Sequence, residues 1–262
     1  MPDSSVRGSQ VVSRVGEVLR AVSTAGSVGA TANEVAARCA LTRPTAHRLL
    51  NSLAREGLLD QDGPRGRWFL GPELFVLGAV AAERYDITDT ARPHVRELAR
   101  ISGESAFLSA RRGGETVCLL REEGSFPIRS FVLYEGVRFP LGVASAGLAI
   151  LAFLNDVDAH VAGDALVARW GAAHSTAAIQ ERIAATRSAG YAVNPGLLVE
   201  GSWGMGAAVF DAKGEPAWAL SLTGVESRFG PDRRASLGRL LLDRAHELTR
   251  ELNDRRPSSA HA

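Results

Sequence analysis

The sequence is poor in cysteine, in long apolar runs and in features of an export signal. Its 262 residues include only two cysteines, Cys39 and Cys118, with no CxxC spacing. This argues against a disulfide framework or a zinc finger and favours a reducing compartment. The sequence contains no run of about 18 apolar residues, so no membrane span is predicted. The first residues also lack the apolar stretch of a signal peptide. These absences predict a cytoplasmic protein with no membrane partner.

Catalytic and metal-binding patterns are missing as well. None of the motifs GxSxG, GxxxxGK[ST] and HExxH occurs in the sequence, so the commonest hydrolase, nucleotide-binding and zinc-protease signatures are excluded. No two of the six histidines lie at ligand spacing on one face of an expected helix. We therefore expect no catalytic residues, no metal site and no cofactor.

The charges are unevenly distributed, although the net charge is only +1. Residues 1–71 carry nine arginines against six acidic residues, which gives +3, and the remainder is −2. Lys213 is the only lysine in the chain. A basic N-terminal part on a slightly acidic body fits a DNA-reading module attached to a second domain.

Residues 42–55 have the pattern of a helix with two different faces. One face carries an apolar stripe at helical spacing. The stripe consists of Ala46, Leu49, Leu50 and Leu53. The other face offers hydrogen-bond donors and hydroxyls, with no carboxylate before Glu56, and can meet phosphates and base edges. Two interpretations remain open for this stretch alone: a DNA recognition helix, or an ordinary amphipathic helix with a solvated basic face.

The elements before this helix complete a helix-turn-helix. Thr31 and Glu34 match the capping-box pattern, which predicts a helix from Thr31 to about Cys39. A tight turn then leads to the second helix, with Thr42 as the expected N-cap and Pro44 tolerated in the first turn. Two short helices joined in this way are typical of the motif.

A helix over residues 9–25 and a β-hairpin are expected to flank the motif. The apolar positions of that helix are predicted to face the core; they are Val11, Val12, Val15, Val18, Leu19 and Val22. After the second helix, strands near 58–60 and 67–70 enclose a turn at 62–66, which predicts a wing. Its arginines, Arg65 and Arg67, could approach DNA, or simply solvate the turn.

The rest of the chain predicts an α+β domain, with helices on one side of an antiparallel sheet. A helix over 86–102 is expected to turn its apolar residues inward; these are Ile87, Ala91, Val95, Leu98 and Ile101. Strands are expected at 105–111, 116–121, 129–133, 205–211 and 217–223, the first two joined by Gly113-Gly114. Further helices are expected at 144–154, 158–170, 176–190 and 231–252.

Several stretches, in order along nearly the whole chain, resemble the IclR-type transcriptional regulators. They are LTRPTAHRLLNSLAREGLL with the wing and Phe-Leu-Gly-Pro after it, Pro72–Gly78, Gly136–Leu141 with Ala146–Ala152, Gly190-Tyr191-Ala192 with Glu200-Gly201, Ala207–Asp211 and Ala219–Gly224. The resemblance implies a winged helix-turn-helix at residues 9–71, a linker and dimerisation helix at 72–84, and a GAF-like effector-binding domain at 85–254.

The first domain supplies the candidate DNA contacts. They are Thr42, Arg43, Thr45, His47, Arg48, Asn51, Arg55, Arg65 and Arg67. Those nearest the N-terminal half of the second helix are the best candidates for base or phosphate contact, whereas Asn51 and Arg55 are expected to contact the DNA backbone. A single DNA-binding domain with a net charge of +3 is expected to bind DNA weakly, because affinity comes largely from neutralised phosphates. A dimer, or a dimer of dimers, on near-palindromic double-stranded DNA is therefore implied.

The second domain supplies a candidate effector site. Ser221 and Thr223 are two apart on a strand and share a face, and the helix start at Ser145 offers free backbone N–H groups to an anion. The glycines of 201–206 are best explained by close backbone approach. With the resemblance, the candidate effector-binding residues are Ser145, Ala146, Asn194, Ser202, Gly204, Ser221 and Thr223.

Two of these positions depart from the resembled family. Asn194 stands where an acidic residue is common, and Gly204 where a cysteine is common, so we expect a less charged and roomier pocket. A small organic acid is the expected ligand, and ordinary packing is the alternative interpretation of these positions.

The sequence thus predicts a sequence-specific DNA-binding regulator, not an enzyme. Repression is the commoner mode in the resembled family, so we expect a repressor whose DNA binding responds to the acid. The alternative is a small-molecule-binding or enzymatic α+β protein whose N-terminal helices only mediate partner binding.

Overall fold

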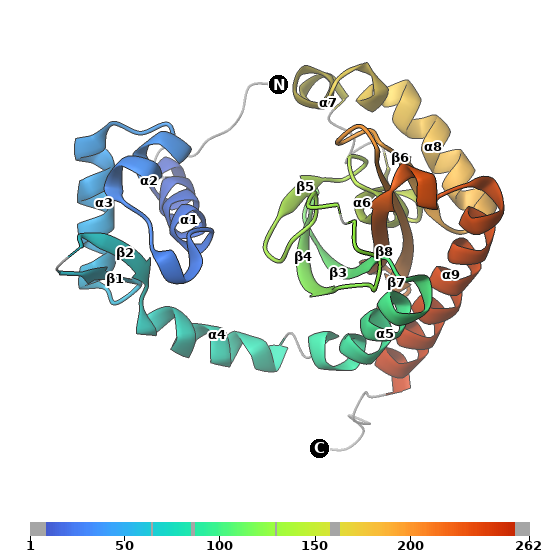
Figure 1. The fold of residues 1–262 in the computed structure, drawn as a ribbon, viewed down its shortest axis with the longest axis horizontal. Helices are drawn as coiled ribbons and strands as arrows, with labels where there is room; N and C mark the ends of the chain where they lie inside the picture. Colours follow the sequence, from blue (N-terminus) through green and yellow to red (C-terminus); the bar gives the residue numbers. More distant parts are fainter. Residues whose placement is uncertain (1–8, 64, 85–86, 129, 158–162, 255–262) are drawn as a thin grey trace. The chain divides into compact units, whose positions relative to one another are not determined.

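The computed structural model describes residues 9–254, except residues 64, 85–86, 129 and 158–162 (Figure 1). Contacts within the chain divide it into two units, residues 1–85 and 86–262, and each is considered by itself below. None of the helices in the described ranges has the length and apolar character needed to cross a membrane. Those same ranges contain no group of three or more His, Cys, Asp or Glu side chains that could hold a metal ion.

The first unit is a helix-turn-helix with a wing and one further helix. Its elements are α1 (Ser9–Ser23), α2 (Ala32–Arg38), α3 (Arg43–Arg55), β1 (Leu59–Asp62), β2 (Arg67–Leu70) and α4 (Pro72–Arg84). Its core gathers Val18, Val22, Val35, Leu50, Leu53, Leu59 and Trp68. The expectation for α1 was wrong at Val11 and Val12, which are 58% and 72% exposed. The core contacts only the C-terminal part of α1, so these two valines lie beyond it.

The turn between α2 and α3 is built from local interactions. The predicted capping box is confirmed: Thr31 Oγ1 accepts from the backbone N–H of Glu34 at 3.2 Å, and Glu34 Oε2 accepts from the N–H of Thr31 at 2.7 Å. At the bend, Ala40 has a φ of 50°, in the left-handed region that glycine adopts most easily. The predicted stripe of α3 packs inward, with Ala46, Leu50 and Leu53 buried.

The wing is the predicted β-hairpin. β1 and β2 pair antiparallel from Leu59 with Leu70 to Asp62 with Arg67. Trp68 is only 1% exposed, and its backbone exchanges two hydrogen bonds with Ala30, at 2.9 and 2.8 Å. The wing is thereby attached to the loop that precedes α2.

The second unit is built on a six-stranded antiparallel sheet with strand order β5-β4-β3-β8-β7-β6. The strands are β3 (Ser105–Arg112), β4 (Glu115–Glu122), β5 (Arg138–Pro140), β6 (Ala192–Pro195), β7 (Ser202–Phe210) and β8 (Pro216–Val225). Gly113-Gly114 forms the predicted turn between β3 and β4. The turn between β7 and β8 presents Lys213, whose backbone N–H donates to Asp211 Oδ1 at 2.8 Å.

Helices cover both faces of this sheet, so the expectation of a single covered face was wrong. The helices are α5 (Ile87–Ser102), α6 (Ser145–Ala152), α7 (Gly163–Trp170), α8 (Thr176–Ala189) and α9 (Pro231–Asp254). α5 and α9 pack on the face that carries Met205, Ala207 and Val209, whereas α6 contacts the opposite face of β7 and β8 (Figure 1). Both faces of these strands consist of small or apolar residues, and both must therefore be covered.

Three further details differ from the sequence-based expectation. Residues 130–133 form no strand; β5 pairs with β4 instead, and Cys118 bonds the backbone of Gly136 and Val137. The edge strand β6 was not predicted. Ile101 is 50% exposed because it lies on the outer side of α5. The start of the helix expected at 158–170 lies outside the described residues.

Candidate DNA interface and effector cavity

The outer face of α3 is basic and accessible. Arg43, His47, Arg48, Asn51 and Arg55 are exposed, while the apolar stripe on the opposite side anchors the helix in the core. No acidic side chain interrupts this face before Glu56. Such a surface can donate hydrogen bonds to phosphate oxygens and to the acceptor edge of guanine.

The start of α3 differs from the expected cap. Thr42 occupies the N-cap position, but its hydroxyl accepts no bond from the backbone of the helix. Instead, Thr42 Oγ1 and Thr45 Oγ1 are 2.9 Å apart and share one hydrogen bond. The free N–H groups of the first turn therefore remain available to an external anion.

His47 is oriented by Asn51, one turn along α3. The amide nitrogen of Asn51 lies 2.9 Å from His47 Nδ1 and 2.9 Å from the carbonyl oxygen of His47. Because an amide nitrogen only donates, Nδ1 accepts, and the proton of the neutral ring resides on Nε2. Asn51 was expected to contact the DNA backbone, but both of its N–H bonds are used within the helix. The amide of Asn51 therefore fixes the orientation of the His47 ring.

The two wing arginines differ in surroundings. Arg65 is exposed, whereas Arg67 is half-buried and its Nη1 donates to the carbonyl oxygen of Gly29 at 2.7 Å. Arg67 therefore holds the wing against the loop before α2, and Arg65 is the wing arginine with an accessible guanidinium.

In the second unit, five of the seven candidate effector residues line one small cavity between α6 and the ends of β6, β7 and β8. They are Ser145, Asn194, Ser202, Gly204 and Thr223. We call this space the inner cavity; its volume is about 20 Å³, which is room for about one water molecule. Ala146 is buried in the core, and Ser221 lies on the same face of β8, further along the strand. Neither borders the inner cavity.

The expectation of a roomier pocket was wrong. A Cβ atom on Gly204 would lie 3.0 Å from Ser145 Oγ, and one on Gly206 would lie 2.9 Å from the backbone oxygen of Ser145. The space that a side chain at these positions would fill is therefore occupied by the start of α6. The predicted close backbone approach at this glycine-rich stretch is confirmed.

Three buried hydroxyls lie on the sheet face that α6 covers. Ser105 Oγ, Ser221 Oγ and Thr223 Oγ1 have no hydrogen-bond partner among the described residues. Ser105 pairs with Thr223 across β3 and β8, so it adds a hydroxyl that the sequence did not reveal. A buried polar group without a partner costs about 1–3 kcal/mol, which a hydrogen-bonding ligand or water would recover.

Asn194 lines the inner cavity and also makes two hydrogen bonds within the fold. Its Nδ2 donates to the carbonyl oxygen of Val143 at 2.8 Å, and its Oδ1 accepts from the N–H of Leu197 at 2.9 Å. The amide therefore connects β6 to the segment before α6 and fixes one wall of the inner cavity.

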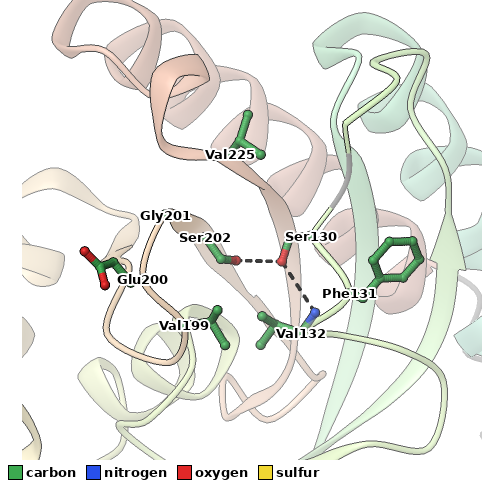
Figure 2. A pocket seen from close by; sticks show the side chains of 8 residues that line it. All are labelled: Ser130, Phe131, Val132, Val199, Glu200, Gly201, Ser202 and Val225. Atoms are coloured by element: carbon green, nitrogen blue, oxygen red, sulfur yellow. Dashed lines mark hydrogen bonds between the residues drawn. The ribbon is translucent and has the colours of Figure 1, made fainter.

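A larger groove borders the inner cavity (Figure 2). We call it the outer groove; its volume is about 460 Å³, and it is lined by Ser130, Phe131, Val132, Val199, Glu200, Gly201, Ser202 and Val225. Ser130 Oγ and Ser202 Oγ are 2.6 Å apart across it. Val132 and Ser202 line both spaces, so the two are neighbours.

Comparison with known proteins decides the family. The family described as IclR helix-turn-helix domain matches residues 11–63, and the one described as bacterial transcriptional regulator IclR C-terminal matches residues 79–250. The chain belongs to the IclR family. It is a DNA-binding transcriptional regulator, and the enzymatic alternative is not supported.

Full-length relatives agree with this assignment. The chain is 28% identical over 239 residues to the regulator BhcR of Paracoccus denitrificans, covering 90% of this chain and 85% of BhcR. It is 26% identical over 253 residues to the transcriptional repressor AllR of Escherichia coli K12, covering 94% of this chain and 91% of AllR. Both IclR relatives are named as regulators of transcription.

Solved structures share the fold. An IclR regulator from Alicyclobacillus acidocaldarius has a TM-score of 0.72 at 23% identity, with 93% of this chain and 98% of the other covered. An IclR homologue from Microbacterium hydrocarbonoxydans, complexed with 4-hydroxybenzoate, has a TM-score of 0.72 at 22% identity, with 93% and 99% covered. The winged helix-turn-helix and the α+β effector domain are thus those of the family.

Proposed function

We propose that this protein is a cytoplasmic repressor that reads a near-palindromic operator through α3 and responds to a small organic acid. The exposed face of α3 carries the proposal: it presents arginines and an oriented histidine donor with no carboxylate before Glu56. We assign base or phosphate contact to Arg43, Thr45, His47 and Arg48. The relative AllR, named a repressor, supports the sign of regulation.

Self-association follows from α4. Its apolar side chains are largely exposed: Phe75 by 81%, Val76 by 55%, Leu77 by 51% and Val80 by 67%. An exposed apolar stretch of this size on one helix indicates an interaction surface. We propose that residues 72–84 link the DNA-binding domain (9–71) to the effector domain (85–254) and join two copies, in a dimer or a dimer of dimers.

The effector proposal rests on the unpartnered hydroxyls beside the start of α6. Free N–H groups at a helix start favour an anion, and Thr223 Oγ1 borders the inner cavity without a partner. A carboxylate can accept from both kinds of donor. The bound 4-hydroxybenzoate of the Microbacterium homologue supports an organic acid as the class of ligand.

DNA reading is tested by gel shift with DNA from the region upstream of the gene and with a scrambled sequence of equal length. We expect sequence-selective, salt-dependent binding, weakened about tenfold in Arg48→Ala because a good base contact contributes about 1–3 kcal/mol. Arg96→Ala is the matched control, since it removes the same charge from an exposed helix of the effector unit. Equal binding of both DNAs would refute the proposal.

Effector binding is tested by thermal shift and calorimetry with benzoate and 4-hydroxybenzoate. We expect stabilisation of the native protein and a smaller effect in Thr223→Val, which removes the unpartnered hydroxyl that borders the inner cavity. Undiminished stabilisation of this variant would place the site elsewhere.

A further inference from the structure

The inner cavity is too small to hold an organic acid alone. At about 20 Å³ it accommodates about one water molecule, or one end of a larger molecule after a modest shift of its walls. Ligand sites for small molecules commonly measure about 300–1,000 Å³. The outer groove, at about 460 Å³, has this size.

Both spaces have a mostly apolar lining, but they differ in the polar groups that they offer. The inner cavity offers polar groups: the hydroxyl of Thr223, which is 6% exposed and unpartnered, Ser145 at the start of α6, and Asn194. The outer groove is mostly apolar, with Val132, Val199 and Val225 among its walls. A ligand that matched both would be polar at one end and apolar at the other.

The inner cavity and the outer groove share a border. Ser202 and Val132 line both spaces, and the hydrogen bond between the hydroxyls of Ser202 and Ser130 lies at this border (Figure 2). In Figure 2, Val199 and Val132 lie below this bond and Val225 lies above it. A ligand that extends from the inner cavity into the outer groove therefore passes the hydroxyls of Ser202 and Ser130 and then contacts valine side chains.

The charged side chain in the outer groove limits the charge that the ligand can carry there. Glu200 is its only ionisable lining residue, and no arginine or lysine lines either space among the described residues. A second carboxylate at this end would be repelled by Glu200 and would find no cation. The outer end of the ligand therefore carries no second carboxylate.

We propose that the outer groove binds the apolar tail of a monocarboxylic acid whose carboxylate lies against Thr223 and the start of α6. This inference rests on the proposed effector function and narrows it: the effector is an amphipathic acid with a tail of several carbons, and the outer groove is its tail site. Entry of the carboxylate requires the Ser130–Ser202 hydrogen bond to open or Val132 to move aside.

The test is isothermal titration of the full-length protein with butanoate, hexanoate and octanoate. Burying one methylene contributes about 0.8 kcal/mol, which is about a fourfold gain in affinity. We expect octanoate to bind at least tenfold more tightly than butanoate. Octanol, which has the tail without the carboxylate, should bind at least tenfold more weakly than octanoate. Thr223→Val should reduce this difference in affinity between octanoate and octanol.

Two matched variants locate the tail. Val199 is 53% exposed in the outer groove, and Ile101 is 50% exposed on α5, away from it. Val199→Asp should abolish the dependence on chain length, whereas Ile101→Asp should preserve it. Because both side chains are half-exposed, neither substitution removes a core contact.

The outcomes separate this inference from the proposed function. If butanoate and octanoate bind equally, the tail site is wrong although the effector proposal stands. Octanol binding as tightly as octanoate, or an unchanged chain-length dependence in Val199→Asp, would also overturn the tail site. If none of benzoate, 4-hydroxybenzoate, butanoate and octanoate binds, the effector proposal fails and the tail site with it.

Discussion

Gly206 and Ser145 approach so closely that a Cβ atom on Gly206 would lie 2.9 Å from the backbone oxygen of Ser145. A side chain at this position must therefore push the start of α6 away from β7. We expect Gly206→Ala to lower the free energy of unfolding by about 1–3 kcal/mol, as overpacking of a core does, and to impair benzoate binding. Urea unfolding measures the first effect. Gly114→Ala is the control, because a Cβ there meets no atom within 4 Å; equal losses in both variants would contradict the packing explanation.

Ala40 holds a left-handed backbone, with φ at 50°, in the bend of the helix-turn-helix. Glycine adopts this conformation without the Cβ penalty of about 1–2 kcal/mol, although it loses about 0.5–1 kcal/mol more through chain entropy. We expect Ala40→Gly to raise the free energy of unfolding by about 0.5 kcal/mol. Ala37→Gly, three residues earlier on the exposed side of α2, should lower it by about 1 kcal/mol. Thermal unfolding that ranks the variants in the opposite order would refute the strain at Ala40.

Burial raises the pKa of the Cys118 thiol from 9.0 to about 12, with a further contribution from the Glu135 carboxylate. The folded protein keeps this proton longer than the unfolded chain. The stabilisation from Cys118 is therefore complete below pH 9 and is lost as the pH rises from 9 towards 12, at no more than about 1.4 kcal/mol per pH unit. We expect the stability difference between the wild type and Cys118→Ala to shrink by about 1 kcal/mol from pH 8.5 to pH 10. A difference independent of pH, measured by urea unfolding under reducing conditions, would contradict this assignment.

Glu104 is 1% exposed at its side chain and lies 2.7 Å from Arg228 Nε and 2.9 Å from Arg233 Nη2. It connects the start of β3 to the beginning of α9. Removal of one partner from a buried ion pair leaves charge uncompensated, so Glu104→Ala should cost about 3 kcal/mol. The exposed pair of Glu97 and Arg100 provides the comparison: Glu97→Ala should change the denaturation midpoint very little. Similar effects of the two substitutions would show that Glu104 contributes no more than a surface pair.

The sequence predicted best the elements that local interactions determine. The capping box of Thr31 and Glu34, the stripe on α3 and the Gly113-Gly114 turn each depend on residues a few positions apart, and each is confirmed. The family assignment, which rested on several stretches in order, is confirmed by the family matches.

Features set by distant parts of the chain could not be predicted. β6 has only four residues, and its pairing with β7 identifies it as a strand. Residues 130–133 have strand-like composition, but the edge of β4 is paired with β5 instead. Ser105 joins the candidate effector site only because β3 pairs with β8, and the space expected at Gly204 is filled by Ser145 from another element. No periodicity in the sequence contains this information.

The isolated lysine in the β7–β8 turn has a practical consequence. Lys213 is exposed and carries the only side-chain amine of the protein. Besides the α-amino group of the chain, amine-reactive dyes and coupling chemistries will therefore modify one side chain, at a hairpin tip of the effector unit, and will leave every arginine of α3 intact. A chain immobilised through Lys213 on a sensor surface should keep its DNA-facing helix unmodified, so association with operator DNA can be followed in real time without engineering a tag.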